Sequence, residues 1–305
     1  MTATNVMLKH CIELFKVVEN YIIKEKGYLY TKVAKISKET KDISTDFDIE
    51  AENRIIEYCK TNRLPVIINS EESGMVPISR NPEYVLLIDP VDGSTNLKKR
   101  IEGSAVCITG LTYRGDNKLN ASDVQFSLIG SLLTHSVVTG TKGQGVKYNG
   151  IFSGYRDISV SGSQNTYLSK ACLEIDMDYG LDEVGDTDLE EAKKFERILP
   201  LFYPRRQFKH LRRNGSAALG MMGVLMGHLD NRYSGLDAYL DARDLLTPEN
   251  WLGALMLTIE AGGKFTDLDN NTITDIPDTL TPYSFLATGN PILHDKIIEA
   301  IKRQL

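Results

Sequence analysis

Two apolar runs that end in clustered carboxylates constrain this sequence most. The segment VIINSEESG, residues 66–74, passes from an apolar run into a pair of glutamates that begins at Glu71. The segment LLIDPVDGSTNL, residues 86–97, passes from an apolar run into Asp89 and Asp92. Short apolar runs bounded by turn residues predict buried β-strands. We therefore expect two buried strands that lie alongside each other and bring their carboxylates to one spot.

The overall composition is that of a globular protein. The chain has 305 residues, of which 42% are hydrophobic and 25% charged, and such a length can bury one large core or two medium ones. The net charge of −6 and the pI near 5.5 argue against a nucleic-acid-coating surface, because phosphate contacts need a basic excess. We expect no nucleic-acid partner.

Cysteine usage and hydropathy indicate a cytoplasmic protein. The four cysteines are scattered, without a CxxC pair, which is typical of reduced thiols rather than of disulfides or a zinc site. The sequence contains no run of 18 apolar residues, and charged residues interrupt its first 22 positions. Neither a membrane span nor a signal peptide is predicted.

Apolar periodicity predicts a mixed α/β chain. We expect helices over residues 5–26, from Asp48 onward, and over 187–200, 215–229 and 250–261. We expect strands within residues 64–70, 84–90, 105–113, 124–133, 135–150 and 166–176, and after the glycine pair at 262–263. A polar, glycine-rich stretch near residues 152–163 predicts a boundary between an N-terminal domain of residues 1–155 and a C-terminal domain of residues 156–305.

The acidic cluster has the composition of a site for a hard cation. Mg²⁺ prefers oxygen ligands, and Glu71, Asp89 and Asp92 would repel one another without a positive charge between them. Gly93 permits close backbone approach, and the N–H groups of residues 93–95 can hold an anion. Acids that bind metal beside an anion-binding turn favour metal-assisted phosphoryl transfer to water. The alternative is an ordinary turn, since Asp and Gly are common turn residues.

Three segments together closely resemble the inositol monophosphatase superfamily of Mg²⁺-dependent, lithium-sensitive sugar phosphatases. They are NSEESG, IDPVDGSTN and IEAGGKFTD, and residues 89–96 match the family pattern D-P-[ILV]-D-G-[ST]-x-N throughout. The resemblance covers nearly the whole chain. It implies a two-domain, layered αβαβα sugar-phosphatase fold with the active site between the domains, two or three Mg²⁺ ions with Mn²⁺ as a substitute, and a homodimer.

The resemblance also implies roles for individual residues in the reaction. The metal ligands are expected to be Glu71, Asp89, the main-chain carbonyl of Val91, Asp92 and the residue at position 250, Asn250. Asp48 and Ser94, assisted by Glu71, are expected to be catalytic by orienting the attacking water. The amides of Gly93 and Ser94 are expected to hold the substrate phosphate, and Thr95 belongs to the same turn.

A second group of residues is expected to bind the rest of the substrate. Asp241 matches an acidic position that contacts substrate hydroxyls, and Gly215, Ser216 and Ala217 match a segment that lines the sugar pocket. Arg212 and Arg243 are candidates for binding a second phosphate, for which arginine forks are well suited. An exposed basic face is the alternative for the arginines around position 212.

Position 250 departs from the family pattern, which has an aspartate ten residues before the glutamate of EAGG. The glutamate of EAGG is Glu260, and the residue ten positions before it is Asn250. Glu249 immediately precedes Asn250. An asparagine carbonyl can still ligate Mg²⁺ but brings no negative charge. A one-residue shift could bring Glu249 inward instead, or Asn250 could belong to a helix start. Either metal arrangement would hold the second ion more weakly.

The expected activity is hydrolysis of a phosphomonoester by in-line attack of metal-activated water. The expected substrate is a small phosphorylated polyol or sugar, inositol 1-phosphate or fructose 1,6-bisphosphate. Two alternatives stay open: a 3'-phosphoadenosine 5'-phosphate phosphatase, and a catalytically weakened phosphosugar-binding protein.

Overall fold

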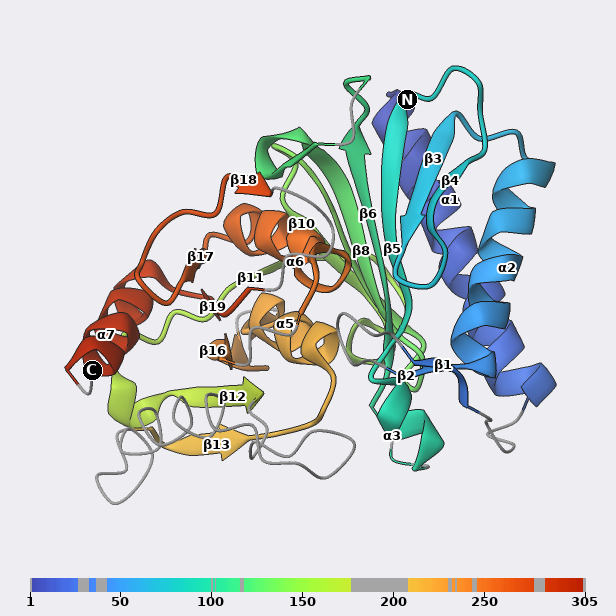
Figure 1. The fold of residues 1–305 in the computed structure, drawn as a ribbon. Coiled ribbons are helices and arrows are strands. Elements are labelled where there is room, and N and C mark those ends of the chain that lie inside the picture. The colour runs from blue at the N-terminus through green and yellow to red at the C-terminus, as the bar shows by residue number, and fades with distance from the viewer. Residues whose placement is uncertain are drawn as a thin grey trace.

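Five layers of secondary structure make up the part of the protein that the structure describes. The computed structural model describes residues 2–26, 33–36, 43–99, 101, 103–115, 118–176, 208–229, 232–233, 235–242, 246–276 and 283–303. Two helices cover one face of a large sheet, two more helices separate that sheet from a smaller one, and a last helix covers the far face of the smaller sheet (Figure 1). This αβαβα order confirms the predicted fold class.

The described elements alternate along the chain. The helices and helical turns are α1 (Ala3–Glu19), η1 (Asn20–Lys26), α2 (Asp46–Thr61), α3 (Ser94–Lys98), η2 (Ala121–Asp123), η3 (Ile151–Ser153), η4 (Leu168–Lys170), α5 (Ala217–Leu225), α6 (Pro248–Glu260) and α7 (Pro291–Lys302). The first strands are β1 (Val33–Ile36), β2 (Ile43–Thr45), β3 (Val66–Ser70), β4 (Gly74–Pro77), β5 (Tyr84–Asp92), β6 (Ala105–Thr112), β7 (Leu119–Asn120), β8 (Val124–Ser131), β9 (Ser136–Thr141) and β10 (Val146–Asn149). The later strands are β11 (Ile158–Ser161), β12 (Cys172–Asp176), β13 (His210–Arg212), β14 (His228–Leu229), β15 (Arg232–Tyr233), β16 (Ala238–Asp241), β17 (Lys264–Asp267), β18 (Asp275–Ile276) and β19 (Phe285–Thr288).

The large sheet has ten strands in the order β15-β14-β11-β10-β9-β8-β6-β5-β3-β4. Strands β3 and β5 run parallel, and the other described neighbours in this sheet are antiparallel. Each residue of β5 is buried. Its side chains alternate: Val85 and Leu87 face α5 and α6, while Leu86 and Ile88 face α1 and α2. A strand buried on both faces needs a continuous apolar run, which is the pattern the sequence shows.

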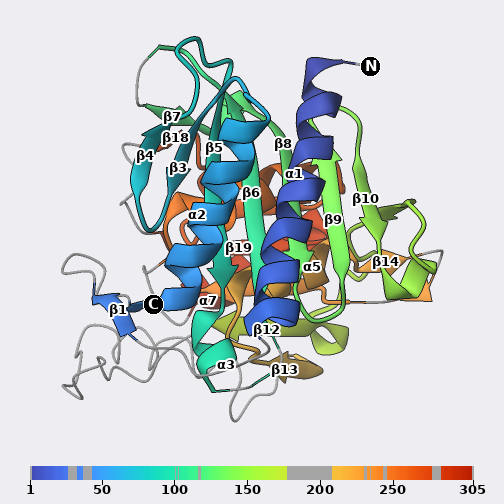
Figure 2. The same ribbon diagram turned by 90° about the vertical axis from the view of Figure 1, so that its right-hand side faces the viewer.

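Helices α1 and α2 lie side by side over the outer face of the large sheet (Figure 2). The hydroxyl of Thr2 accepts a hydrogen bond from the N–H of Asn5 and so caps the start of α1, which satisfies one of the first free donors of the helix. Phe15 on α1 fits against Gly130 of β8, where an added Cβ would lie 2.3 Å from the ring. This helix therefore packs directly on the sheet backbone.

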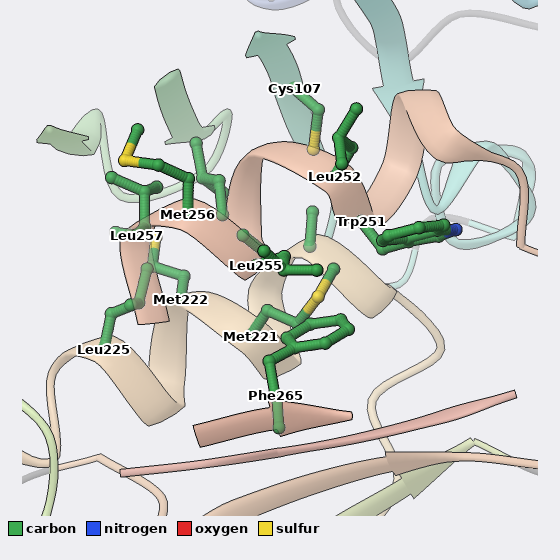
Figure 3. Close-up of a cluster of buried hydrophobic side chains, with 14 of the residues drawn as sticks. Cys107, Met221, Met222, Leu225, Trp251, Leu252, Leu255, Met256, Leu257 and Phe265 are labelled. Atoms are coloured by element: carbon green, nitrogen blue, oxygen red, sulfur yellow. The ribbon is translucent and has the colours of Figure 1, made fainter. Parts of the chain in front are cut away.

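Helices α5 and α6 form the middle layer, and their apolar side chains meet each other and both sheets (Figure 3). Gly253 of α6 lies so close to β6 and β8 that a Cβ there would come within 2.1 Å of the Thr109 hydroxyl. At the end of α6 the Glu260 carboxylate accepts hydrogen bonds of 2.7 and 3.0 Å from the N–H groups of Gly143 and Gly145, in the turn between β9 and β10. The C-terminal end of α6 is thus fixed to the large sheet.

The smaller sheet has the strand order β13-β12-β16-β19-β17 and is covered on its outer face by α7. His294 of α7 is fully buried between two threonines of this sheet. Its Nε2 lies 2.8 Å from the Thr266 hydroxyl and its Nδ1 lies 3.1 Å from the Thr288 hydroxyl. Burial lowers the pKa of His294 to about 4, and the charge of nearby Lys264 acts in the same direction, against Asp295.

The structure confirms most of the predicted elements, but the helix predicted over 215–229 ends at Leu225 and is followed by β14. The predicted helix over 5–26 corresponds to α1 and η1, and the helix expected from Asp48 begins two residues earlier, at Asp46. The predicted helix over 187–200 lies outside the described residues. The division at residues 155/156 stays a prediction: β11, β14 and β15, which follow it, extend the large sheet.

We expect His294 to make stability sensitive to acid. Because its folded pKa of about 4 lies below the ordinary value of 6.5, the stability it contributes is complete above pH 6.5 and falls as the pH decreases toward 4. His294→Gln should therefore lose less of its unfolding temperature between pH 7 and pH 5 than the wild type. Thermal unfolding followed by circular dichroism measures both slopes. Removing an exposed histidine, with His210→Gln, is the control, and equal slopes in His294→Gln and wild type would contradict the expectation.

Candidate active site

A β-bulge at the end of β5 brings Asp89 and Asp92 to the same face of the large sheet. Asp89 pairs with Cys107 and Asp92 pairs with Ala105, so three steps on β5 match two steps on β6. In a regular strand, residues three apart point to opposite faces. The extra residue of the bulge shifts the alternation of side chains by one position. Val91 therefore points into the core under α1 and α2. Both aspartates consequently face the middle layer of helices.

The Pro-Val pair between the aspartates suits this bulge. Pro90 has no N–H to offer to the neighbouring strand. The N–H of Val91 donates a 2.8 Å hydrogen bond to Oδ1 of Asp89 instead of to β6. The backbone N–H of Val91 is thus hydrogen-bonded within the motif, and one oxygen of Asp89 is held in place.

A sharp turn follows directly after Asp92. Gly93 has φ of 79° and is the residue before α3, whose first residues are Ser94 and Thr95. A Cβ at Gly93 would lie 2.8 Å from the carbonyl oxygen of Gly103 and 3.0 Å from Cβ of Ser216. Both the backbone conformation and the space at this position therefore require glycine.

The side chain of Asn96 ties this turn to the C-terminal half of the chain. Its Nδ2 donates to the carbonyl oxygens of Gly103 at 2.7 Å and Asn214 at 2.8 Å, and it lies 3.3 Å from that of Gly215. These bonds hold Asn214 and Gly215 against the expected phosphate-binding turn, and Gly215 is the first residue of the expected sugar-binding segment. Sequence reasoning gave Asn96 no role, although it is the last residue of the matched motif.

Asp92 lies at the start of α5. Its Oδ2 accepts hydrogen bonds from the hydroxyl of Ser216 and, at 2.9 Å, from the N–H of Ala218. Ser216 is also the N-cap of α5, since its hydroxyl accepts from the N–H of Leu219. The N-terminus of a helix favours a negative charge, so α5 stabilises ionised Asp92. Ser216 and Ala217, expected to line a sugar pocket, thus lie beside a predicted metal ligand.

Glu71 follows β3 at the same sheet edge. The parallel register pairs Ser70 with Ile88, which places Glu71 next to the position of Asp89, and its side chain is exposed. Asp48 is 5% exposed and lies in the first turn of α2. Asp48 therefore lies inside the helix and not at its first residue, where the sequence placed it.

The electrostatics show that three of the predicted ligands share one neighbourhood. Burial raises the pKa of the Cys107 thiol well above its ordinary value, and the negative charges of Asp92, Asp89 and Glu71 raise it further. Among the residues that the structure describes, no three acidic, His or Cys side chains converge as ligands of a single ion. The three carboxylates nevertheless have the charge and the oxygen donors that Mg²⁺ requires.

Asn250 reaches the same group of carboxylates from α6. Its Nδ2 donates a 2.6 Å hydrogen bond to Oδ2 of Asp89. Its Oδ1 accepts from the N–H and the hydroxyl of Thr247, the N-cap of α6, both at 3.2 Å. The expected carbonyl ligand thus faces the helix start, and the amide group faces the acid. Asn250 serves the helix cap and the site together.

Glu249, the other candidate at this position, is also buried. Burial raises its pKa to about 7, against its own N–H and a hydrogen bond with Thr247, both of which lower it. The contact with Asp89 is made by Asn250. The structure therefore favours Asn250 over Glu249 as the residue from α6 that belongs to the carboxylate group.

The smaller sheet contributes a second buried set of polar side chains, on β12 and β16. Asp176 and Asp241 are register partners, and the Tyr239 hydroxyl lies 3.3 Å from Oδ2 of Asp176 and 3.4 Å from Oδ2 of Asp241. Glu174, the partner of Tyr239, is 3% exposed. Burial and then the charge of Asp176 raise the pKa of Glu174 to about 8.

Of the two arginine candidates for a second phosphate, the structure describes Arg212. Arg212 is exposed on β13 and pairs in register with Glu174, whose pKa its charge lowers. Arg243 lies outside the described residues. Sequence reasoning identified Asp241 but gave no role to Glu174, Asp176 or Tyr239, which share its face of the sheet.

A family model and several known proteins match this chain. The family model described as "Inositol monophosphatase family" matches residues 4–305. The chain is 29% identical over 266 residues to the chloroplastic phosphatase IMPL1 of Arabidopsis thaliana, covering 87% of this chain and 62% of that protein. It is 27% identical over 296 residues to the bifunctional NADP phosphatase/NAD kinase of Methanococcus maripaludis, covering 94% and 47%. The chain therefore spans less than two thirds of either relative.

A third relative matches along most of its length. This is the fructose-1,6-bisphosphatase/inositol-1-monophosphatase of Methanothermobacter thermautotrophicus, 24% identical over 259 residues, with 84% of this chain and 82% of that protein covered. Among solved structures, the suppressor protein suhB of Bartonella henselae has a TM-score of 0.77 at 19% identity, with 98% and 100% of the two chains covered. An IMPase/NADP phosphatase solved with Mg²⁺ and phosphate has a TM-score of 0.71 at 15% identity, with 98% and 95% covered.

These two structural likenesses show the fold, and the family model, which covers nearly the whole sequence, shows the relationship. The matched motif at residues 89–96 carries the bulge, the two aspartates, the glycine turn and the Asn96 contacts described above. This chain belongs to the inositol monophosphatase family.

Proposed function

We propose that this protein is a Mg²⁺-dependent phosphomonoesterase that hydrolyses a small phosphorylated polyol or sugar. The observation that carries the proposal is the bulge of β5, which places Asp89 and Asp92 on one face, directly before the Gly93 turn. Two acids of one strand can then hold a cation beside the amides that hold a phosphate.

Different residues of the site would bind the metal, position the phosphate and orient the water. Glu71, Asp89 and Asp92, with the carbonyl of Val91, would hold Mg²⁺; when bound, this ion supplies a Lewis acid that lowers the pKa of water and offsets phosphate charge. The turn at Gly93 and Ser94 positions the phosphate. Ser94, Asp48 and Glu71 would orient the attacking water and accept its proton. The family is Mg²⁺-dependent in general, and two or three ions are part of the proposal.

The substrate class follows from the other side of the site. Asp241, with Asp176 and the Tyr239 hydroxyl beside it, offers acceptors and a donor suited to the hydroxyl groups of a polyol. The exposed guanidinium of Arg212 would attract a second phosphate. Relatives named for inositol monophosphate, fructose 1,6-bisphosphate and NADP set the compounds to test. A homodimer in the cytoplasm completes the proposal; none of the helices in the described segments is long and apolar enough to cross a membrane.

Phosphate release identifies the activity and its substrate. Inositol 1-phosphate, fructose 1,6-bisphosphate, NADP and 3'-phosphoadenosine 5'-phosphate should each be assayed across a Mg²⁺ titration. We expect turnover of a sugar or polyol phosphate. Preference for either nucleotide would show that the substrate is a nucleotide and not a sugar or polyol phosphate. The absence of turnover with all four compounds at every Mg²⁺ concentration would contradict a phosphatase acting on these classes.

Asp92→Asn should abolish most of this turnover while the protein stays folded. The loss should be at least about 100-fold, at the upper end of what changes around a metal ligand produce, because an amide removes the negative charge that faces the cation. Circular dichroism checks folding. Asp157→Asn, at an exposed position bonded to Asn149, is the matched control and should keep full activity. Wild-type turnover in Asp92→Asn would exclude Asp92 as a ligand.

Gly93→Ala should weaken phosphate binding through crowding as well as strain. The measurement is the inhibition constant of inorganic phosphate in the turnover assay, which should rise. Gly115→Ala is the matched control, since Gly115 has φ of 87° and has no atom within 4 Å of the added Cβ. Both variants carry the strain of a left-handed alanine, roughly 1–2 kcal/mol, and the proposal fails if their inhibition constants agree.

A further inference from the structure

We propose that Asn250 is a positioning residue that holds Asp89 by a neutral hydrogen bond and so lets the carboxylate group keep its shape without a bound cation. The bond joins Nδ2 of Asn250 to Oδ2 of Asp89 at 2.6 Å and links two parts of the chain 161 residues apart. The inference rests on the proposed function in one respect: that Asp89 is a ligand of the cation.

The two partners of Asn250 fix the orientation of its amide. The backbone N–H of Thr247 can donate but not accept, so it must face the amide oxygen. An ionised Asp89 can accept but not donate, so it must face the amide nitrogen. Turning the amide over would set two acceptors against each other at Asp89 and two donors against each other at Thr247. The side chain therefore presents N–H to the site in the absence of any ion.

The packing around Asn250 leaves it little room to move. The residue is 8% exposed, and its main-chain oxygen lies 3.7 Å from Sγ of Cys107, which is the register partner of Asp89. One turn farther along α6, Gly253 lies against the hydroxyls of Thr109 and Ser127. The helix thus holds Asn250 over the β5–β6 pair at a fixed height.

The neutral charge of Asn250 matters because the acids around it are already close together. Glu71, Asp89 and Asp92 already share the neighbourhood of Cys107. An acid at position 250 would place two carboxylates at hydrogen-bonding distance, and one of them would need a proton or a cation. Asparagine keeps the shape of that contact and removes the repulsion. The protein should therefore depend less on Mg²⁺ for its stability than a variant with aspartate at this position.

The test compares thermal unfolding of the full chain in EDTA and in increasing Mg²⁺, with Mg²⁺ binding measured by calorimetry. In EDTA, Asn250→Asp should unfold about 5 °C or more below the wild type, as a buried charge without compensation implies. Mg²⁺ should restore more stability to Asn250→Asp than to wild type. Its Mg²⁺ affinity should rise about tenfold, the scale on which groups around a metal ligand act.

An exchanged pair separates positioning from a general effect of substitution. Asp89→Asn combined with Asn250→Asp rebuilds an amide–carboxylate bond with the roles reversed, and should recover most of the stability lost in EDTA. Asn290→Asp is the control for added charge, because Asn290 caps α7 through its oxygen. It should leave the response to Mg²⁺ unchanged.

Two results would overturn the proposal: an equal Mg²⁺ response in Asn250→Asp and wild type, or an exchanged pair no more stable in EDTA than Asn250→Asp. If Asn250→Asp does not yield folded protein, a folded exchanged pair supports the proposal, and its failure beside a folded Asn250→Ala contradicts it. The readout is unfolding and ion binding. A wild type without turnover would therefore defeat the proposed function and leave the role of Asn250 standing.

Discussion

The hydrogen bonds that two distant helices donate to the end of β5 hold this structure together at its centre. Asp92 accepts from the start of α5 and Asp89 accepts from the start of α6. Two carboxylates inside a protein are unfavourable unless donors or cations surround them. Here each acid orders a helix terminus, and each helix terminus stabilises an acid. The middle layer and the large sheet therefore define one another, and the smaller sheet is placed by its packing on that layer.

Local patterns in the sequence predict the mixed α/β elements and the clustered acids, whereas the layered fold is expected from the resemblance to the family. The apolar runs before Glu71 and Asp89 mark strands buried on both faces, and the turn residues after them mark strand ends. The orientation of Asp89 and Asp92 is a different matter. Alternation would place residues three apart on opposite faces, and the bulge that brings them together is a property of the pairing with β6.

Long-range contacts account for the rest of what could not be predicted. Asn250 could be read as a ligand, a helix cap or a neighbour of an inward Glu249, and choosing among these requires knowing that α6 begins above Asp89. On β12, Glu174 and Asp176 alternate with Leu173 and Ile175, a pattern typical of a strand with one exposed polar face. In this fold α5 covers that face, so the acids are buried.

Helix α6 also fixes the distance between two contacts with the large sheet, one at each of its ends. Asn250 stands near one end, over the carboxylates, and Glu260 stands at the other, where it accepts two N–H groups of the β9–β10 turn. Ten residues of α-helix span about 15 Å, and both ends are anchored to the same sheet. The ten-residue spacing between Asn250 and Glu260 therefore sets the distance between the two contacts that α6 makes with the sheet. Inserting or deleting one residue within α6 would rotate one anchor by about 100° relative to the other, so the spacing is set by geometry even where the residue at its start has changed.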